Sequence, residues 1–280
     1  SKIIIILFFA KFFMDHEETL NTLKTLALSG VLLAVPLFLI LEQPDLKNTI
    51  TVVIIFCIMI YVAGLSYKII GGALLIAVPL TIIFLSIVVQ PDQKLLKDYQ
   101  RSRIMSFLYP ENEEYSDDIE QQNNSKTAIA SGELFGKKLS GDNSTTSVNQ
   151  GNFVAENQTD FIFAVAGEEY GFIGCVIIVL LLLAIAFECI RMSLRAKDLS
   201  GKVLCCGIGG LIALQSFINI CVATGLAPNT GTPLPFVSYG LTSLVSLYIG
   251  MGLVLNVGLQ SSTYNKEIIQ KEIDRREDYL

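Results

Sequence analysis

The stretch that decides the fold runs from residue 203 to residue 265 and reads "VLCCGIGGLIALQSFINICVATGLAPNTGTPLPFVSYGLTSLVSLYIGMGLVLNVGLQSSTYN". Its 63 residues contain no Asp, Glu, Lys, Arg or His. A helix needs roughly 20 apolar residues to cross the hydrocarbon core of a bilayer. The stretch is therefore long enough for two crossings, and it predicts an all-α membrane protein.

The composition of the whole chain agrees with this class. Hydrophobic residues make up 52% of the 280, and the mean hydropathy is +0.56. The opening apolar run has no basic leader and no small-residue cleavage site, so it is interpreted as the tail of a helix whose beginning is missing. We therefore expect a fragment of a longer protein, with a single membrane domain over 1–280 and about seven transmembrane helices. The other uncharged or nearly uncharged runs are 3–10, 25–41, 48–67, 69–91 and 170–187.

Basic residues beside the spans predict the orientation. The connection 188–202 is rich in them and is therefore expected to be cytoplasmic. Counting crossings from there places 91–160 outside as one large extracellular loop, and 225–240 on the same side. The tail 263–280 then lies in the cytoplasm.

Charge and motif content exclude several function classes. The net charge of −6 argues against a nucleic-acid partner. His16, the single histidine, falls in an expected cytoplasmic loop, which excludes a histidine-based triad at an outer site. No phosphate-loop or HExxH motif is present. Acidic side chains could bind Mg²⁺, but no ligand spacing supports a choice of metal.

The expected outer loop begins with a predicted amphipathic surface helix around residues 95–107. Arg101 and Arg103 on it could hold a lipid pyrophosphate, because a guanidinium offers paired donors to phosphate oxygens. Interfacial snorkelling is the alternative. The following run "ENEEYSDDIEQQNNS" (111–125) is acidic and polar, and we expect a mobile loop there.

Three carboxylates lie in "TDFIFAVAGEEYGFIG" (159–174), namely Asp160, Glu168 and Glu169. On a continuous helix from Asp160, Glu168 would lie about 12 Å deeper and roughly 80° round the axis, so the two do not form a catalytic pair. An acid inside a span suggests function, but a structural hydrogen bond to a neighbouring helix explains Glu168 and Glu169 equally well.

Prolines shape the segment "LAPNTGTPLPFVSYG" (226–240). Pro228, Pro233 and Pro235 exclude a regular helix between the two flanking spans. An ordinary outer turn is one interpretation. The absence of charge favours a loop folded back into the protein, where it would line a substrate groove close to Asp160.

Five sequence blocks resemble those of one family in order and spacing. They are "LEQPDLKNT", "YQRSRIMSFLYP", "GELFGKKL", "TDFIFAVAGEEYGFIG" and "NICVATGLAPNTGTPLPFVSYG". The family is that of the SEDS proteins (shape, elongation, division and sporulation), which are RodA, FtsW and SpoVE type peptidoglycan polymerases. The resemblance covers nearly all of the chain and implies spans four to ten of a ten-span fold.

The resemblance implies a glycosyltransferase in the bacterial plasma membrane. Such an enzyme polymerises lipid II into β-1,4-linked glycan, releases undecaprenyl pyrophosphate and works with a class B penicillin-binding transpeptidase. Asp160 matches the family's essential acid, and a carboxylate can serve as the base for the acceptor hydroxyl. The residues expected to contact the substrate are Arg101, Arg103, Glu156, Thr159, Lys137, Pro233, Pro235, Ser238 and Tyr239. The residues expected to support the site are Lys2, Asp45, Glu168, Glu169 and Asn219; no metal ligand is assigned.

Several positions depart from the family pattern. Lys47 stands where glycine is usual, and Lys138 replaces the second glycine of a GKG. Ala155 and Gln158 replace proline and histidine ahead of Asp160, and Leu241 replaces a glycine. These changes bear on loop geometry more than on chemistry.

Two other classes of function share these features. A flippase or transporter for lipid-linked precursors would have the same hydropathy, but it would depend on the deeper acids more than on Asp160. A non-catalytic scaffold for the transpeptidase would need no base. The sequence does not separate division, elongation and sporulation roles.

Overall fold

The computed structural model describes residues 2–43, 45–88, 98–109, 116–140 and 159–277. Within these residues the chain is helical and contains no strand. The elements are α1 (Lys2–Asp15), the short 3-10 helix η1 (Glu17–Thr19), α2 (Leu23–Glu42), α3 (Leu46–Val62), α4 (Tyr67–Val88), α5 (Asp98–Leu108), α6 (Ser116–Ser131), α7 (Lys137–Ser140), α8 (Ile162–Leu194), α9 (Leu199–Ala223) and α10 (Leu241–Glu277).

Within the described residues a helix lies in each of the seven apolar runs, and the prediction of an all-α polytopic membrane protein is confirmed. By length and composition, the described residues contain four helices able to cross a membrane: α2, α8, α9 and the part of α10 from Leu241 to Gln260. α3 is a shorter apolar helix. α10 continues through most of 263–280, the segment expected to be a tail.

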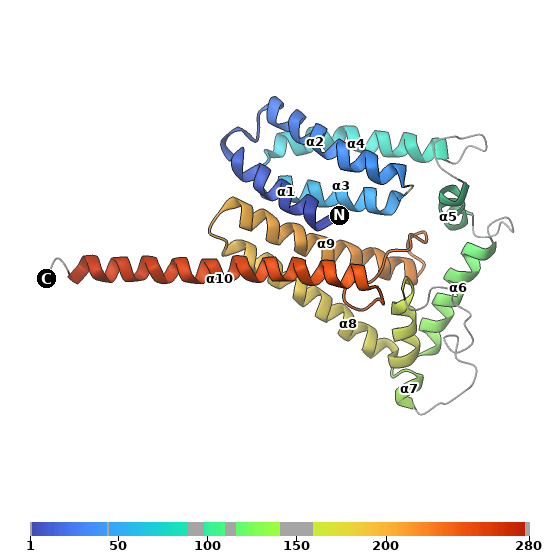
Figure 1. Cartoon of the computed structure of the whole chain (residues 1–280). Coiled ribbons are helices and arrows are strands. Elements are labelled where there is room, and N and C mark those ends of the chain that lie inside the picture. Colours follow the sequence, from blue (N-terminus) through green and yellow to red (C-terminus); the bar gives the residue numbers. More distant parts are fainter. Residues whose placement is uncertain (1, 44, 89–97, 110–115, 141–158, 278–280) are drawn as a thin grey trace.

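Helix α9 is the centre of the bundle. It lies against α1, α3, α8 and α10, and Figure 1 shows it running between the α1–α3 group and α8. Its buried face includes Cys205, Ile208 and Ile212, which join Phe9 and Phe13 of α1 in the main apolar core. These four helices pack against α9. The end of α9 therefore helps to position the segments beside it, which lead into α8 and α10.

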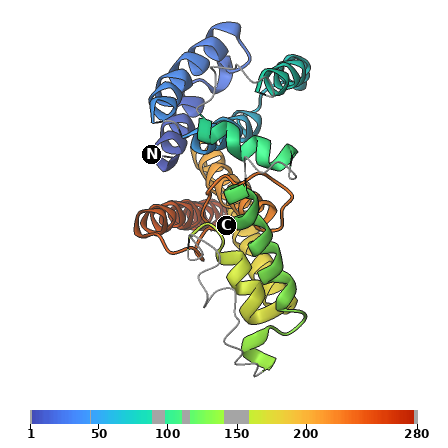
Figure 2. The ribbon, with the colours of Figure 1, turned by 90° about the vertical axis from the view of Figure 1, so that its right-hand side faces the viewer.

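One end of the bundle carries α5, α6, α7 and the irregular segment 224–240, and we call it the site end. Here α8 begins, α9 ends and α10 begins, whereas the connection from α8 to α9 lies at the opposite end (Figure 1). In Figure 2 this end faces the viewer, with α5 and α6 in front of the bundle.

The expectation of a mobile loop over 111–125 was wrong from Ser116 onward, because α6 starts there. The side chains of α6 donate hydrogen bonds to carbonyl groups at the end of α9 and just beyond it. Gln122 Nε2 donates to Val222 O at 3.1 Å and to Ala227 O at 2.7 Å, and Ser125 Oγ donates to Ala223 O at 2.8 Å. A helix end needs such partners when it is buried. The polar composition of α6 therefore provides caps for α9.

Helix α8 also differs from the predicted span over 170–187. It begins at Ile162, and it is broken at Gly171, whose φ of 66° and ψ of −164° are not helical. The segment 132–136, "GELFG", fills the break. Phe172 N donates to Glu133 O at 2.9 Å and Ile173 N to Leu134 O at 3.2 Å. These bonds replace helical ones that the kink removes, so α8 bends without leaving these two amides unpaired.

Candidate functional site

Asp160 lies at the site end, two residues before α8 begins. Its neighbour Phe161 is 1% exposed and packs with Ala164 and Val222 in a small apolar cluster. The side chain of Asn219, which is itself buried in α9, donates from Nδ2 to Asp160 O at 2.7 Å and to Thr232 O at 2.7 Å. One amide of α9 therefore joins the main chain of Asp160 to the segment 224–240.

A second set of bonds ties this segment to residue 159. Ser238 Oγ donates to Thr159 O at 2.6 Å and accepts from Leu234 N at 2.7 Å. Leu234 is 1% exposed and packs into the apolar cluster between α8 and α9. The expectation that the proline-rich segment folds back beside Asp160 is confirmed.

Three charged groups from distant parts of the sequence meet at Gly231. A methyl group added to its Cα would lie 2.8 Å from Asp160 Oδ2, 3.3 Å from Lys47 Nζ and 3.7 Å from Arg103 Nη1. The φ of Gly231 is +62°, a value that favours glycine. Glycine is therefore required here both by the backbone and by the space that the three charged groups share, which we call the Gly231 cradle.

Lys47 comes to the cradle from the first turn of α3. Its ammonium donates to Gly231 O. Asp45, just before α3, is the N-cap of that helix and accepts from Asn48 N at 3.2 Å. Lys2 of α1 is close enough to interact electrostatically with both Asp45 and Lys47. Lys2 and Asp45, which were predicted to support the site, thus lie near Lys47, and their supporting role stays a prediction.

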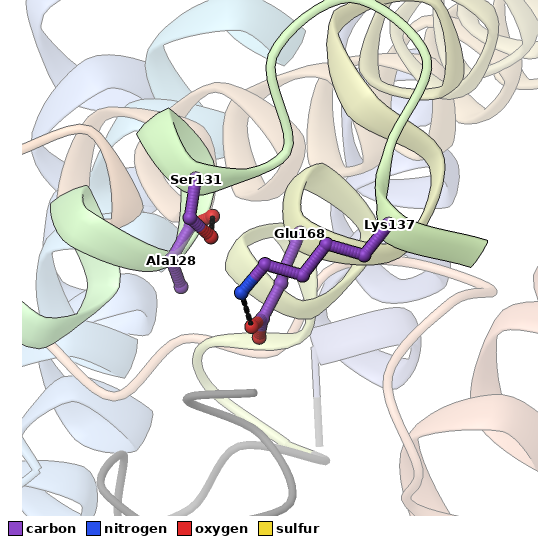
Figure 3. Close-up of polar contacts among 4 residues, drawn as sticks. All are labelled: Ala128, Ser131, Lys137 and Glu168. Atoms are coloured by element: carbon purple, nitrogen blue, oxygen red, sulfur yellow. Dashed lines mark hydrogen bonds and ion pairs between the residues drawn. The ribbon is translucent and has the colours of Figure 1, made fainter. Parts of the chain in front are cut away.

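The other two acids of the 159–174 block lie away from the cradle, against α7. Glu168 is 1% exposed, and its carboxylate binds Lys137 Nζ at 2.7 Å (Figure 3). Glu169 forms a longer, exposed pair with Lys138 at 3.7 Å. The hydrogen bond to the Tyr170 hydroxyl, with the charge of Glu169, raises the pKa of Lys138. This arrangement supports a structural role for both acids. Lys137 was predicted to bind substrate, which stays a prediction, and in this structure its ammonium is engaged with Glu168.

The remaining predicted residues that the structure describes come from α5 and from the segment 224–240. Arg101 lies on α5 with Arg103, and its Nε is buried without a hydrogen-bond partner. Pro235 is buried, Pro233 is half-buried and Tyr239 is 78% exposed. Glu156 falls outside the described residues. Substrate contacts by all of these residues remain predictions.

Lys47 and Gly231 are cradle residues that the sequence prediction did not include. Lys47 was noticed only as a departure from a usual glycine. Because it is separated from Asp160 by more than a hundred positions, only the fold shows that the two groups meet.

The charges of the cradle test whether the acidic side chains could bind Mg²⁺ at this site. Among the described residues, no group of three His, Cys, Asp or Glu side chains is placed to hold a metal ion. Asp160 in the cradle is flanked by two cations, which oppose a divalent metal and favour an anion. The described residues around Asp160 therefore do not fit a magnesium site.

The fold and the site together define a multi-pass, all-α membrane protein with a charged cradle at one end of its bundle. A family model described as cell cycle protein, for FtsW, RodA and SpoVE, matches residues 1–263. The chain belongs to this FtsW/RodA/SpoVE family.

Similar proteins agree with this assignment. Peptidoglycan glycosyltransferase MrdB of Escherichia coli (strain K12) is 33% identical over 272 residues, which cover 96% of this chain and 69% of the relative. Stage V sporulation protein E of Bacillus subtilis (strain 168) is 37% identical over 264 residues, covering 93% of this chain and 67% of the relative. A solved chain from a study of polymerization and crosslinking by a peptidoglycan synthase complex has a TM-score of 0.73 and 27% identity. That match covers 93% of this chain and 69% of the solved one.

Proposed function

We propose that this chain carries the catalytic site of a peptidoglycan glycosyltransferase that joins lipid II units into β-1,4-linked glycan. MrdB of Escherichia coli, a peptidoglycan glycosyltransferase, is 33% identical across most of the chain. The observation that carries the proposal is the meeting of Asp160 with Lys47 and Arg103 at Gly231. A carboxylate beside two cations suits a reaction that removes a proton from one substrate and releases an anion from the other.

Asp160 is the proposed general base. The acceptor hydroxyl loses its proton to the Asp160 carboxylate while its oxygen attacks the anomeric carbon of the donor. The bond between that carbon and the diphosphate oxygen breaks, and undecaprenyl pyrophosphate leaves with the electron pair. One displacement of this kind converts an α-linked donor into a β-linked product.

The site's construction supports this role in two ways. Asn219 and Ser238 bind the main-chain carbonyl groups of Asp160 and Thr159, so the main chain on either side of the Asp160 carboxylate is fixed. Phe161 and Leu234 anchor the two segments in apolar clusters. Such a scaffold restricts the position of a catalytic group, which is the condition for efficient proton transfer.

The partner and location follow from the same family assignment. We infer that the protein lies in the bacterial plasma membrane and works with a class B penicillin-binding transpeptidase. The similar chain from a peptidoglycan synthase complex supports an assembly of this kind.

The test is polymerisation of purified lipid II by the purified protein with its transpeptidase. Asp160→Asn keeps the size and hydrogen-bonding capacity of the side chain but cannot take the proton. We expect the rate of glycan formation to fall by ~10²- to 10⁴-fold. Asp15→Asn is the matched control, because Asp15 is an exposed carboxylate at the opposite end of the bundle. It should leave the rate unchanged.

The same assay separates the other two classes of function. A scaffold predicts equal rates for the wild type and Asp160→Asn. A transporter predicts that Glu168→Gln matters more than Asp160→Asn for movement of lipid II across vesicles. Glycan formation by Asp160→Asn at the wild-type rate, with no second polymerase present, would remove Asp160 as the base.

A further inference from the structure

The chemistry derived so far assigns the cation Lys47 no specific contact with the substrate. It reaches the cradle from α3 and binds the main chain of the segment 224–240 at Gly231 O. Within the described part of the chain, neither Lys47 nor Arg103 forms an ion pair with a carboxylate within 4.0 Å. Two cations that face one small space without such pairs create a positive potential there.

The charges next to the cradle do not cancel this potential. Asp45 accepts hydrogen bonds from the main chain and side chain of Asn48, and it interacts electrostatically with Lys2. Asp160 contributes one negative charge beside Lys47 and Arg103. Lys47, Arg103 and Asp160 thus sum to one positive charge, and the opposite charges of Lys2 and Asp45 beside them offset each other.

The geometry sets the chemical class of the ligand. The Lys47 and Arg103 nitrogens lie 3.3 Å and 3.7 Å from the position of a methyl group on Gly231. Because Gly231 has no such methyl, the three charged groups can approach its main chain closely. Guanidinium and ammonium groups together are suited to phosphate oxygens, the first as paired donors and the second as a point charge.

We propose that Lys47, together with Arg103, binds the diphosphate of the lipid-linked donor next to Asp160 and stabilises it as it leaves. This inference rests on the proposed glycosyltransferase function and adds a substrate-binding residue to it. As the bond from the anomeric carbon to the diphosphate oxygen breaks, the electron pair stays on that oxygen. The ammonium of Lys47 and the guanidinium of Arg103 then face the added negative charge, while the acceptor's proton goes to Asp160. Stabilising charge that develops in the transition state raises the rate of the chemical step.

The test measures binding of inorganic pyrophosphate to the purified protein in detergent, by calorimetry with a chelator present. Lys47→Gln keeps a donor for Gly231 O but removes the charge. It should weaken pyrophosphate binding by about 10- to 100-fold, the range expected for a charge-assisted hydrogen bond. Lys47→Arg keeps the charge and should bind pyrophosphate much more tightly than Lys47→Gln. Lys24→Gln, an exposed lysine of α2, is the matched control and should bind as the wild type does.

Asp160→Asn should change the affinity for pyrophosphate in the opposite direction to Lys47→Gln. Removing the carboxylate should strengthen pyrophosphate binding, because the anion no longer faces a like charge. The melting temperature of each variant is measured in parallel, so that a loss caused by a displaced loop is recognised. If Lys47→Gln binds pyrophosphate as the wild type does, or if the wild type binds none, the inference is overturned.

The two proposals fail in different ways. A protein that binds pyrophosphate with the expected order of variants but makes no glycan keeps the anion site and loses the polymerase function. A protein that makes glycan normally, and whose pyrophosphate affinity does not respond to Lys47→Gln, keeps the function and loses the role of Lys47.

Discussion

Asn219 binds Asp160 through the main-chain carbonyl of Asp160 and leaves the Asp160 carboxylate to other groups. The Nδ2 atom of Asn219 uses one hydrogen for Asp160 O and the other for Thr232 O, both at 2.7 Å. The two acceptors are 72 positions apart in sequence, and the donor is 1% exposed. One buried amide therefore joins the main chain of Asp160 directly to the segment 224–240.

Asn219→Ala should separate these two segments. Two buried carbonyl groups lose their donor, which costs about 1–3 kcal/mol of stability. Because Asp160 also shifts, we expect the rate of glycan formation to fall on the order of 100-fold, as small misplacements of catalytic groups do. The exposed Asn256→Ala in α10 serves as control in thermal unfolding and in the lipid II assay. A variant that unfolds earlier but polymerises at the wild-type rate would contradict the positioning role.

Gly231→Ala should damage the cradle more than the fold. The added methyl would lie 2.8 Å from Asp160 Oδ2 and would occupy the space next to Lys47 and Arg103. The φ of +62° adds strain of roughly 1–2 kcal/mol for a residue with a side chain. We expect loss of both glycan formation and pyrophosphate binding. Gly30→Ala, which meets no atom within 4 Å in α2, should leave both unchanged.

The buried pair of Glu168 and Lys137 should be a stability element. Lys137→Met leaves the Glu168 carboxylate without its partner, and breaking a buried pair in this way costs about 3–5 kcal/mol. Glu168→Gln should cost less, since Lys137 is 21% exposed and can turn toward solvent. The melting temperature in detergent checks this order, with the exposed Lys138→Met as control. If Lys137→Met instead lowers only the rate of glycan formation, Lys137 contacts substrate as the family resemblance implied.

Gly171→Ala should disturb the contact of the GELFG segment with α8. Its added methyl would lie 2.4 Å from Gly136 N and 2.6 Å from Leu134 O, and its φ of +66° disfavours other residues. Such strain costs of order 1–3 kcal/mol. Hydrogen exchange should increase at the amides of Phe172 and Ile173, which lose Glu133 O and Leu134 O. Unchanged exchange at these two amides would contradict the account, and Gly252→Ala is the control because it meets no atom within 4 Å.

Hydropathy was sufficient to predict the membrane helices, because a run of 63 residues without charge is long enough for two helical crossings of a bilayer. The position of the proline-rich segment was also predictable, since unpaired backbone at membrane depth must be buried or line a cavity. By contrast, α6 was missed. Its polar residues suggest a loop by composition, and they form a helix because they cap α9, which no local pattern reveals.

Some residues of the site were predicted and others were missed, because contacts between distant parts of the chain are not visible in the sequence. Asp160 stands out as an acid at the start of an apolar segment. Lys47 does not, because it reaches the cradle from the beginning of a helix that is remote in sequence. Glu168 was correctly separated from Asp160 by helical geometry, but its partner Lys137 was assigned to the substrate because the sequence does not show which acid a lysine faces.

The kink at Gly171 matches α8 to the thickness of a bilayer. As a straight rod, the 33 residues of α8 would measure about 50 Å, well beyond a hydrocarbon core of roughly 30 Å. The part from Phe172 to Leu194 is about 35 Å long, which suffices for one crossing with a slight tilt. The first nine residues of α8, which include Glu168 and Glu169, are then not needed for the crossing and need not contact the acyl chains. With a crossing that begins at the kink, Asp160 would lie at the depth of lipid headgroups, where a polyprenyl carrier anchored in the membrane would present its diphosphate and its sugars.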